Sequence, residues 1–257
     1  MSQIDRVKLM ILDVDGTLHR GSLPAKWHEK MMTRMNRRNE AYNKYCAVRT
    51  SYRQGIASSD DHKQAFIQSW LDCIVHTQID TAIEVGEEVI QEEGLNNFIF
   101  TTHLVRSARA SGFKVIALSS CPQFLLDIFN TNIGMDYCLG ARWEFDRTTN
   151  LFTGKVSNPD IFQSRGTLFQ RAISDIFRGV TVDLGRSFGI GDTLNDVSWL
   201  DQLGSCIAFN PDKPLTGYAR KHSYKYSIIT EHKDVVMDAS FPEILCPIEL
   251  AQLRASG

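Results

Sequence analysis

Short apolar runs recur along the chain and alternate with segments of helical spacing. The first run, Val7–Val14, leads directly into Asp-Gly-Thr, which is typical of a buried parallel strand that ends in a loop. Three more apolar runs each follow a helix-like stretch, and they cover residues 114–119, 187–191 and 205–209. Repeated β-α-β units of this kind predict a doubly wound α/β core with an open parallel sheet.

Residues 23–97 have a different pattern, with many Lys, Arg, Gln and Glu, few β-branched runs, and apolar positions at helical spacing. A helix is expected to begin near Pro24, a residue tolerated in an opening turn, and another after the N-cap residues 58–61. We therefore predict a helical cap domain over 23–97, inserted into a core domain of residues 1–22 and 98–257.

Residues 137–157 combine aromatic residues and threonines with a polar turn at 146–150. This pattern predicts a small β-hairpin at the edge of the core.

The composition adds little to this picture. The 257 residues are 43% hydrophobic and 23% charged, as in ordinary globular proteins, and the formal net charge of −2 gives no general attraction to nucleic acid or membranes. No apolar run approaches the roughly 20 residues of a membrane span, and the first residues lack a signal pattern, so a cytoplasmic protein is expected. Six scattered cysteines form no C-x-x-C pair, which predicts reduced thiols.

Acidic residues follow two of the predicted strands. Asp13 and Asp15 end the first, and Asp192 ends the run over 187–191. Because the carboxyl ends of parallel strands meet in one crevice, Asp13, Ser119 and Asp192 are expected to converge there. One carboxylate of the first pair can attack phosphorus while the other protonates the leaving oxygen and then activates water. Asp13 and Asp192 suit Mg²⁺, which prefers oxygen ligands, and Asp196 is placed to orient a water or pair with a cation.

The opening D-x-D-G-T-L, residues 13–18, and the closing G-D-T-x-x-D, residues 191–196, resemble the first and fourth motifs of the haloacid dehalogenase (HAD) superfamily. Within it, residues 115–122, 152–154 and 207–212 resemble the phosphoserine-phosphatase-like branch. The resemblance implies a Rossmann-like core, a helical cap after the first motif, Mg²⁺, and a covalent aspartyl-phosphate intermediate.

The same resemblance assigns roles to individual residues. Asp13 becomes the nucleophile, and Asp15 the general acid and base, with its backbone carbonyl on the metal. Ser119 becomes the hydroxyl that holds a phosphoryl oxygen. The third motif normally supplies a lysine to the phosphate, but here Arg165 stands at the most natural alignment and Lys155 is the other candidate. An arginine differs from a lysine in reach and geometry, so the two are not equivalent.

Two features concern the substrate. Phosphoserine-specific relatives carry a glutamate shortly after the first motif, whereas residues 19–22 here read His-Arg-Gly-Ser, which argues against phosphoserine as the substrate.

A basic cluster follows, made up of Lys26, Lys30, Arg34, Arg37 and Arg38. A solvated helix face is the preferred interpretation of this cluster, and a cap helix facing an anionic substrate or a nucleic-acid surface are the alternatives.

The sequence therefore predicts a Mg²⁺-dependent hydrolase of small phosphate monoesters, with a small phosphorylated metabolite as partner. Two alternatives stay open: a phosphotransferase or mutase that uses the same intermediate, and a non-catalytic regulatory protein on the same fold. The sequence does not determine the substrate or the oligomeric state.

Overall fold

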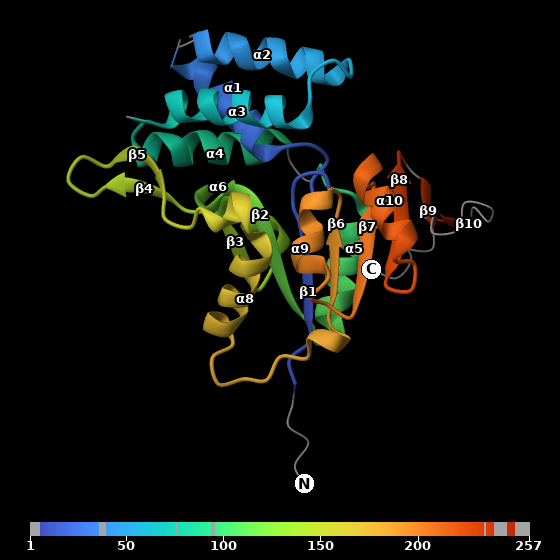
Figure 1. The fold of residues 1–257 in the computed structure, drawn as a ribbon. Helices are drawn as coiled ribbons and strands as arrows, with labels where there is room; N and C mark the ends of the chain where they lie inside the picture. The colour runs from blue at the N-terminus through green and yellow to red at the C-terminus, as the bar shows by residue number, and fades with distance from the viewer. Residues whose placement is uncertain are drawn as a thin grey trace.

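A central sheet organises the protein (Figure 1). The computed structural model describes residues 6–35, 40–75, 77–93, 96–233, 235–238 and 246–249. Within them, eight strands form one sheet in the order β10-β9-β8-β7-β6-β1-β2-β3. The strands are β1 (Leu9–Leu12), β2 (Lys114–Pro122), β3 (Tyr137–Ala141), β6 (Phe188–Gly191), β7 (Ser205–Phe209), β8 (Tyr226–His232), β9 (Val235–Asp238) and β10 (Cys246–Glu249). Neighbours from β3 to β8 are parallel, and β9 and β10 are antiparallel.

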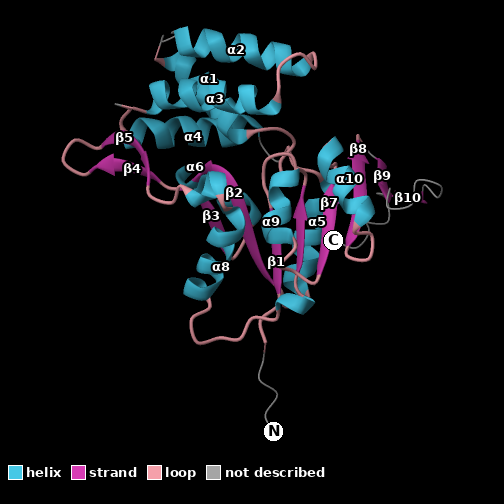
Figure 2. Ribbon diagram, viewed as in Figure 1, coloured by secondary structure: helices cyan, strands magenta, loops and turns pink. Residues whose placement is uncertain are grey.

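Helices cover both faces of this sheet, as Figure 2 shows. Met10 and Leu12 of β1 pack in one core with α5 (Ile99–Ala110) and α6 (Gln123–Ile133). Leu9 and Ile11 pack in a second core with α8 (Arg165–Ile176), α9 (Val197–Leu200) and α10 (Lys213–Lys221). Successive strand residues point to opposite faces, so a strand buried on both sides is apolar throughout. The predicted doubly wound α/β core is confirmed.

A group of helices lies above the carboxyl ends of the central strands (Figure 1). It contains α1 (Leu23–Arg34), α2 (Glu40–Arg53), α3 (Ser59–Ile74) and α4 (Ile79–Glu93). The Ser22 hydroxyl accepts the N–H of Ala25 at the start of α1, with Pro24 in the first turn. Ser58 and Asp61 form a capping box at the start of α3. Both helices begin where the sequence predicted them, because side-chain oxygens satisfy backbone N–H groups at a helix start.

The basic cluster of α1 pairs with α4. Its described members form ion pairs at 2.9–3.1 Å, together with a shorter contact of Lys30 with Glu92. The pairs are Lys26 with Glu93, Lys30 with Glu88 and Glu92, and Arg34 with Glu84 and Glu88. The described cations of the cluster therefore form ion pairs between two helices. Arg37 and Arg38 lie outside the described residues.

The prediction of one hairpin over residues 137–157 was wrong in its first part. Residues 137–141 form β3, a parallel edge strand of the main sheet beside β2. The hairpin consists of β4 (Trp143–Asp146) and β5 (Leu151–Val156) alone. It docks on the helical group, since the N–H of Phe152 donates to the carbonyl of Thr77 at 3.0 Å. Backbone pairing with β2, which no local pattern reveals, separates β3 from the hairpin.

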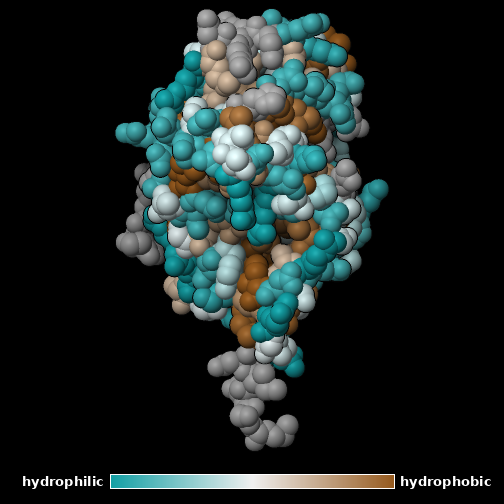
Figure 3. Space-filling model, turned by 90° about the vertical axis from the view of Figure 1, so that its left-hand side faces the viewer, coloured by the Kyte–Doolittle hydropathy of each residue, from teal (hydrophilic) through white to brown (hydrophobic). Residues whose placement is uncertain are grey.

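Figure 3 shows the side of the molecule that lies to the left in Figure 1, where the hairpin lies. Hydrophilic residues cover most of it, and hydrophobic residues show in separate patches between them. Within the described part of the chain, none of the helices combines the length and apolarity needed to cross a bilayer. Among the described side chains, Cys46, Cys121, Cys138 and Cys206 are free thiols.

Candidate active site

The loop after β1 presents two carboxylates. The N–H of Asp13 donates to the carbonyl of Ile190 at 3.0 Å, which ties the end of β1 to β6. The Asp13 side chain is buried and accepts the N–H of Val14 at 2.8 Å. Asp15 accepts the N–H of Leu23 at 2.7 Å, so its carboxylate also anchors the start of α1. Both side chains thereby have fixed positions at the junction of the sheet and the helical group.

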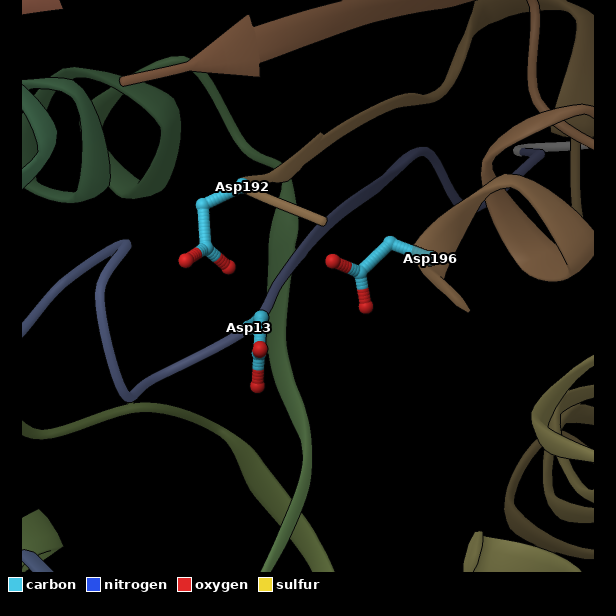
Figure 4. A group of neighbouring side chains, drawn as sticks. All are labelled: Asp13, Asp192 and Asp196. Carbon is cyan, nitrogen blue, oxygen red and sulfur yellow. The ribbon is translucent and has the colours of Figure 1, made fainter. Parts of the chain in front are cut away.

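The loop after β6 adds two more carboxylates. Asp192 follows the last residue of β6, and Asp196 ends a short 3₁₀ turn in which it accepts the N–H and hydroxyl of Thr193 at 3.1 and 3.0 Å. One oxygen from each of Asp13, Asp192 and Asp196 lies within 4.8 Å of the other two. In Figure 4, Asp192 and Asp196 point toward Asp13 from two sides.

Glycines allow the two loops to approach. Gly16 has a φ of +87°, and a Cβ built there would lie 2.3 Å from Oδ2 of Asp192. Beside it, the Thr17 hydroxyl donates to Oδ1 of Asp192 at 3.3 Å. Since only glycine adopts this conformation readily and no side chain fits the gap, Gly16 is required for the close contact of the loops. Sequence reasoning missed the role of Thr17.

Arg165 supplies a positive charge to these carboxylates. Its Nη1 lies 2.7 Å from Oδ1 of Asp196 and 3.8 Å from Oδ2 of Asp13. The side chain is 14% exposed, at the first residue of α8. Lys155 is exposed on β5 and does not line the cavity. Of the two cations that the sequence left open, the structure brings Arg165 to the carboxylates.

Charge repulsion and burial raise the pKa values of three carboxyl groups in the site. Burial raises the pKa of Asp13 to about 7, helped by Asp196 and opposed by Arg165. Burial and the charges of Asp13 and Asp196 raise the pKa of Asp192 to about 9. Burial and Asp13 raise the pKa of Asp15 to about 7. The site has more negative charge than its guanidinium neutralises, which favours binding of a cation.

Ser119 completes the convergence at the carboxyl ends of the strands. It lies in β2, is 1% exposed, and its hydroxyl lowers the pKa of Asp13. Its oxygen also accepts the N–H of Cys121 at 3.3 Å. Asp13, Ser119 and Asp192, which are far apart in the sequence, therefore line one cavity.

This cavity has a volume of about 750 Å³ and lies between the strand ends and the helical group. Its apolar lining includes Phe66, Ile67 and Trp70 of α3, Trp143 of β4, and Phe162 of α7 (Asp160–Gln163). Sequence reasoning assigned none of these to the site. Large apolar residues at helical spacing indicate a core face equally well, so no local signal could have identified them.

The family model of the haloacid dehalogenase-like hydrolases matches residues 10–201, from β1 to beyond α9. The chain belongs to this family. The matched span contains every carboxylate of the site, Ser119 and Arg165, and it confirms the resemblance found in the motifs.

Curated relatives are distant. A phosphoserine phosphatase of Archaeoglobus fulgidus is 28% identical over 116 residues, which cover 45% of this chain and 32% of that protein. The chain thus matches about a third of the length of this HAD relative. An inhibition of morphological differentiation protein of Streptomyces azureus is 22% identical over 217 residues, covering 80% of this chain and 73% of that protein.

Solved structures share the HAD fold. A protein of unknown function from Bordetella pertussis Tohama I superposes with a TM-score of 0.69 at 18% identity, covering 86% of this chain and 98% of the other. A phospho-aspartyl intermediate analogue of phosphoserine phosphatase superposes with a TM-score of 0.56 at 18% identity, covering 83% and 91%. At these identities the likeness establishes the fold.

Proposed function

We propose that this HAD protein is a Mg²⁺-dependent phosphatase that hydrolyses small phosphate monoesters through an aspartyl-phosphate at Asp13. The observation that carries the proposal is the convergence of Asp13, Asp15 and Arg165 at the base of one cavity. A buried nucleophile, a neighbouring acid and a cation for the phosphoryl group are what this reaction requires.

The residues present fit a hard divalent cation. Carboxylate oxygens are the ligands Mg²⁺ prefers, and a bound cation would relieve the repulsion between carboxylates that raises the pKa of Asp192. We assign Asp13, Asp192 and the backbone carbonyl of Asp15 as its ligands. Asp196 has a supporting role, because its carboxylate is already paired with Arg165. When bound, the ion neutralises charge on the phosphoryl group and lets an anionic nucleophile approach it.

The reaction then has two displacements. The Asp13 carboxylate attacks phosphorus, the bond from phosphorus to the ester oxygen breaks, and Asp15 gives its proton to the departing alkoxide. The raised pKa of Asp15 suits this step, since a substantial fraction is protonated near neutral pH. The Asp15 carboxylate next takes a proton from the water that attacks the acyl phosphate. Phosphate leaves, and Asp13 is restored.

Arg165 and Ser119 are assigned to the phosphoryl oxygens. Both side chains line the cavity, and the guanidinium has further N–H groups besides the one that contacts Asp196. Asp196 positions the guanidinium before substrate binds, so little reorganisation of Arg165 is needed as charge shifts onto the phosphoryl oxygens.

The helices of residues 23–97 are assigned as a cap domain on the core of residues 1–22 and 98–257. Two segments of the chain connect the cap to the core, and they are hydrogen-bonded to each other. The N–H of Arg20 donates to the carbonyl of Asn96 at 2.8 Å, and the N–H of Phe98 donates to the carbonyl of Leu18 at 2.9 Å. A cap hinged there would control access of water to Asp13, which distinguishes hydrolysis from phosphoryl transfer to another acceptor.

The deciding experiment measures phosphate release from p-nitrophenyl phosphate and a panel of metabolite monoesters. We expect turnover that needs Mg²⁺, is lost in EDTA, and falls at least about 1,000-fold in Asp13→Asn, because the nucleophile is removed. Asp72→Asn, on the exposed surface of α3, is the matched control and should keep full activity. Equal turnover by the wild type and Asp13→Asn would contradict the proposal.

A further inference from the structure

The cavity has two chemically different ends. Its charged lining residues among those the structure describes are Asp13, Asp15, Arg165 and Asp192, and all of them belong to the phosphate end. The rest of the lining is uncharged. Its polar groups are the side chains of Ser22, Ser120, Thr193, Asn195 and Ser198. Among the described lining residues, the part of a substrate beyond the phosphate therefore meets neutral groups.

An aromatic wall faces this neutral end. The rings of Phe66 and Trp70 have centroids 5.8 Å apart, and those of Trp70 and Trp143 are 6.0 Å apart. Trp70 is 2% exposed, and its ring centroid lies 4.6 Å from that of Trp27, so packing against Trp27 fixes the position of this ring. Residues of the cap and of the β4–β5 hairpin thus form one surface suited to the face or edge of another ring.

The size of the cavity agrees with a bulky leaving group. Its volume of about 750 Å³ falls within the range of about 300–1,000 Å³ typical of pockets for small organic ligands. A phosphate group alone would leave most of this space, including the aromatic wall, unused.

Among the described lining residues, none offers a charge to a charged leaving group at this end of the cavity. An ammonium or carboxylate moved from water into this part of the cavity would lose hydration without gaining an ion pair. The nearby cations of α1 are paired with glutamates of α4 and do not line the cavity.

On these grounds we infer that the site is specific for phosphate monoesters of uncharged, ring-bearing alcohols. This inference rests on the proposed phosphatase function and names its substrate class. Contact with the partly exposed rings of Phe66 and Trp143 binds the leaving group, and the absence of charge among the described lining residues at that end rejects amino-acid phosphates such as phosphoserine.

The test compares phenethyl phosphate, ethyl phosphate and phosphoserine, with p-nitrophenyl phosphate as a general reporter of turnover. Phenethyl and ethyl phosphate both release simple primary alcohols, so their difference reports binding of the ring rather than leaving-group chemistry. Full burial of a phenyl group predicts a kcat/KM about 10- to 100-fold higher for phenethyl phosphate than for ethyl phosphate. Phosphoserine should be the poorest of the three.

The outcomes separate the two proposals. If p-nitrophenyl phosphate is hydrolysed but ethyl phosphate or phosphoserine matches phenethyl phosphate, the substrate class is wrong and the phosphatase function stands. If no ester is hydrolysed, the proposed function fails, and the substrate class falls with it.

A substitution in the aromatic wall tests whether the wall causes the preference for phenethyl phosphate. Trp143→Ala should reduce the ratio of kcat/KM between phenethyl and ethyl phosphate by about 10-fold, because it removes one ring of the wall. Phe145→Ala is the matched control, since Phe145 lies two residues away on the same strand, is 39% exposed, and does not line the cavity. A ratio that is unchanged in Trp143→Ala, or reduced equally in both variants, would overturn the assignment of the wall.

Discussion

Nη1 of Arg165 lies 2.7 Å from Oδ1 of Asp196, and both side chains are largely buried. The carboxylate fixes the guanidinium at the start of α8, where its Nη1 lies 3.8 Å from Oδ2 of Asp13. Asp196 in turn is held by Thr193 of its own loop. The position of the cation thus depends on packing between α8 and the loop after β6.

Arg165→Ala should lower kcat/KM for p-nitrophenyl phosphate by about 100- to 1,000-fold, because a positioned donor to the phosphoryl oxygens is lost. Arg165→Lys should recover part of this loss, since it restores charge without the planar fork. Steady-state kinetics measure both. Arg171→Ala, on the same helix with a side chain 65% exposed, is the control. An Arg165→Ala enzyme within two-fold of the wild type would remove Arg165 from the mechanism.

Gly16→Ala should weaken Mg²⁺ binding by at least about 10-fold, because its Cβ would displace Asp192 from a position only 2.3 Å away. The left-handed backbone at Gly16 adds strain of about 1–2 kcal/mol. Gly112→Ala carries the same kind of strain at φ +77° but has open space around its Cβ. Metal titration followed by calorimetry should therefore separate the two variants, and equal Mg²⁺ affinities would show that the contact with Asp192 is unimportant.

Stabilisation by Mg²⁺ should grow as the pH rises from 6 to 9. Without metal, the folded state keeps protons on Asp13 and Asp192, whose pKa values are raised to about 7 and about 9, whereas the unfolded chain has lost them. The metal-free protein therefore loses stability as the pH rises through this range. Mg²⁺ needs the ionised carboxylates, so its binding is strongest where this loss is largest.

Thermal melts at several pH values, with and without Mg²⁺, measure this effect. The increase in Tm caused by Mg²⁺ should be larger at pH 9 than at pH 6, and Asp192→Asn should reduce the difference. An increase in Tm that is the same at all pH values would contradict the assigned ligands.

The packing of helices α1 to α4 should lose stability in mild acid because of His28. This side chain is fully buried among aromatic rings, its Nε2 lies 3.1 Å from the Ser69 carbonyl, and burial lowers its pKa to about 4. The unfolded chain binds a proton near pH 6.5 and the folded chain only near pH 4, so stability is complete above 6.5 and falls between these values. The loss is on the order of 3 kcal/mol.

Chemical unfolding followed by circular dichroism at pH 7, 6, 5 and 4.5 tests this slope. His28→Gln carries no titrating ring, so its free energy of unfolding should change less over this range, whatever its stability at neutral pH. Identical slopes for the variant and the wild type would assign the acid sensitivity to other groups.

Several parts of the fold were predictable because their signals are local. The apolar run through β1, the helix start near Pro24 and the helix N-cap at Ser58 each depend on neighbours within a few positions. Local sequence patterns do not predict contacts between residues that are far apart in the sequence. Strand β8 was missed, since its residues mix polar and apolar types. Its buried Glu231 accepts the N–H groups of Ile99 and Phe100 at the start of α5, more than 130 positions away.

The sequence by itself determined the α/β core and the carboxylates that follow its strands, because parallel strands bring their carboxyl ends to one edge whatever lies between them. The tertiary structure alone decided that Arg165, and not Lys155, approaches Asp13. It also decided that Trp70 and Trp143 share a cavity wall. Spacing along the chain cannot settle such contacts, since they depend on how α3, α8 and the β4–β5 hairpin pack over the sheet.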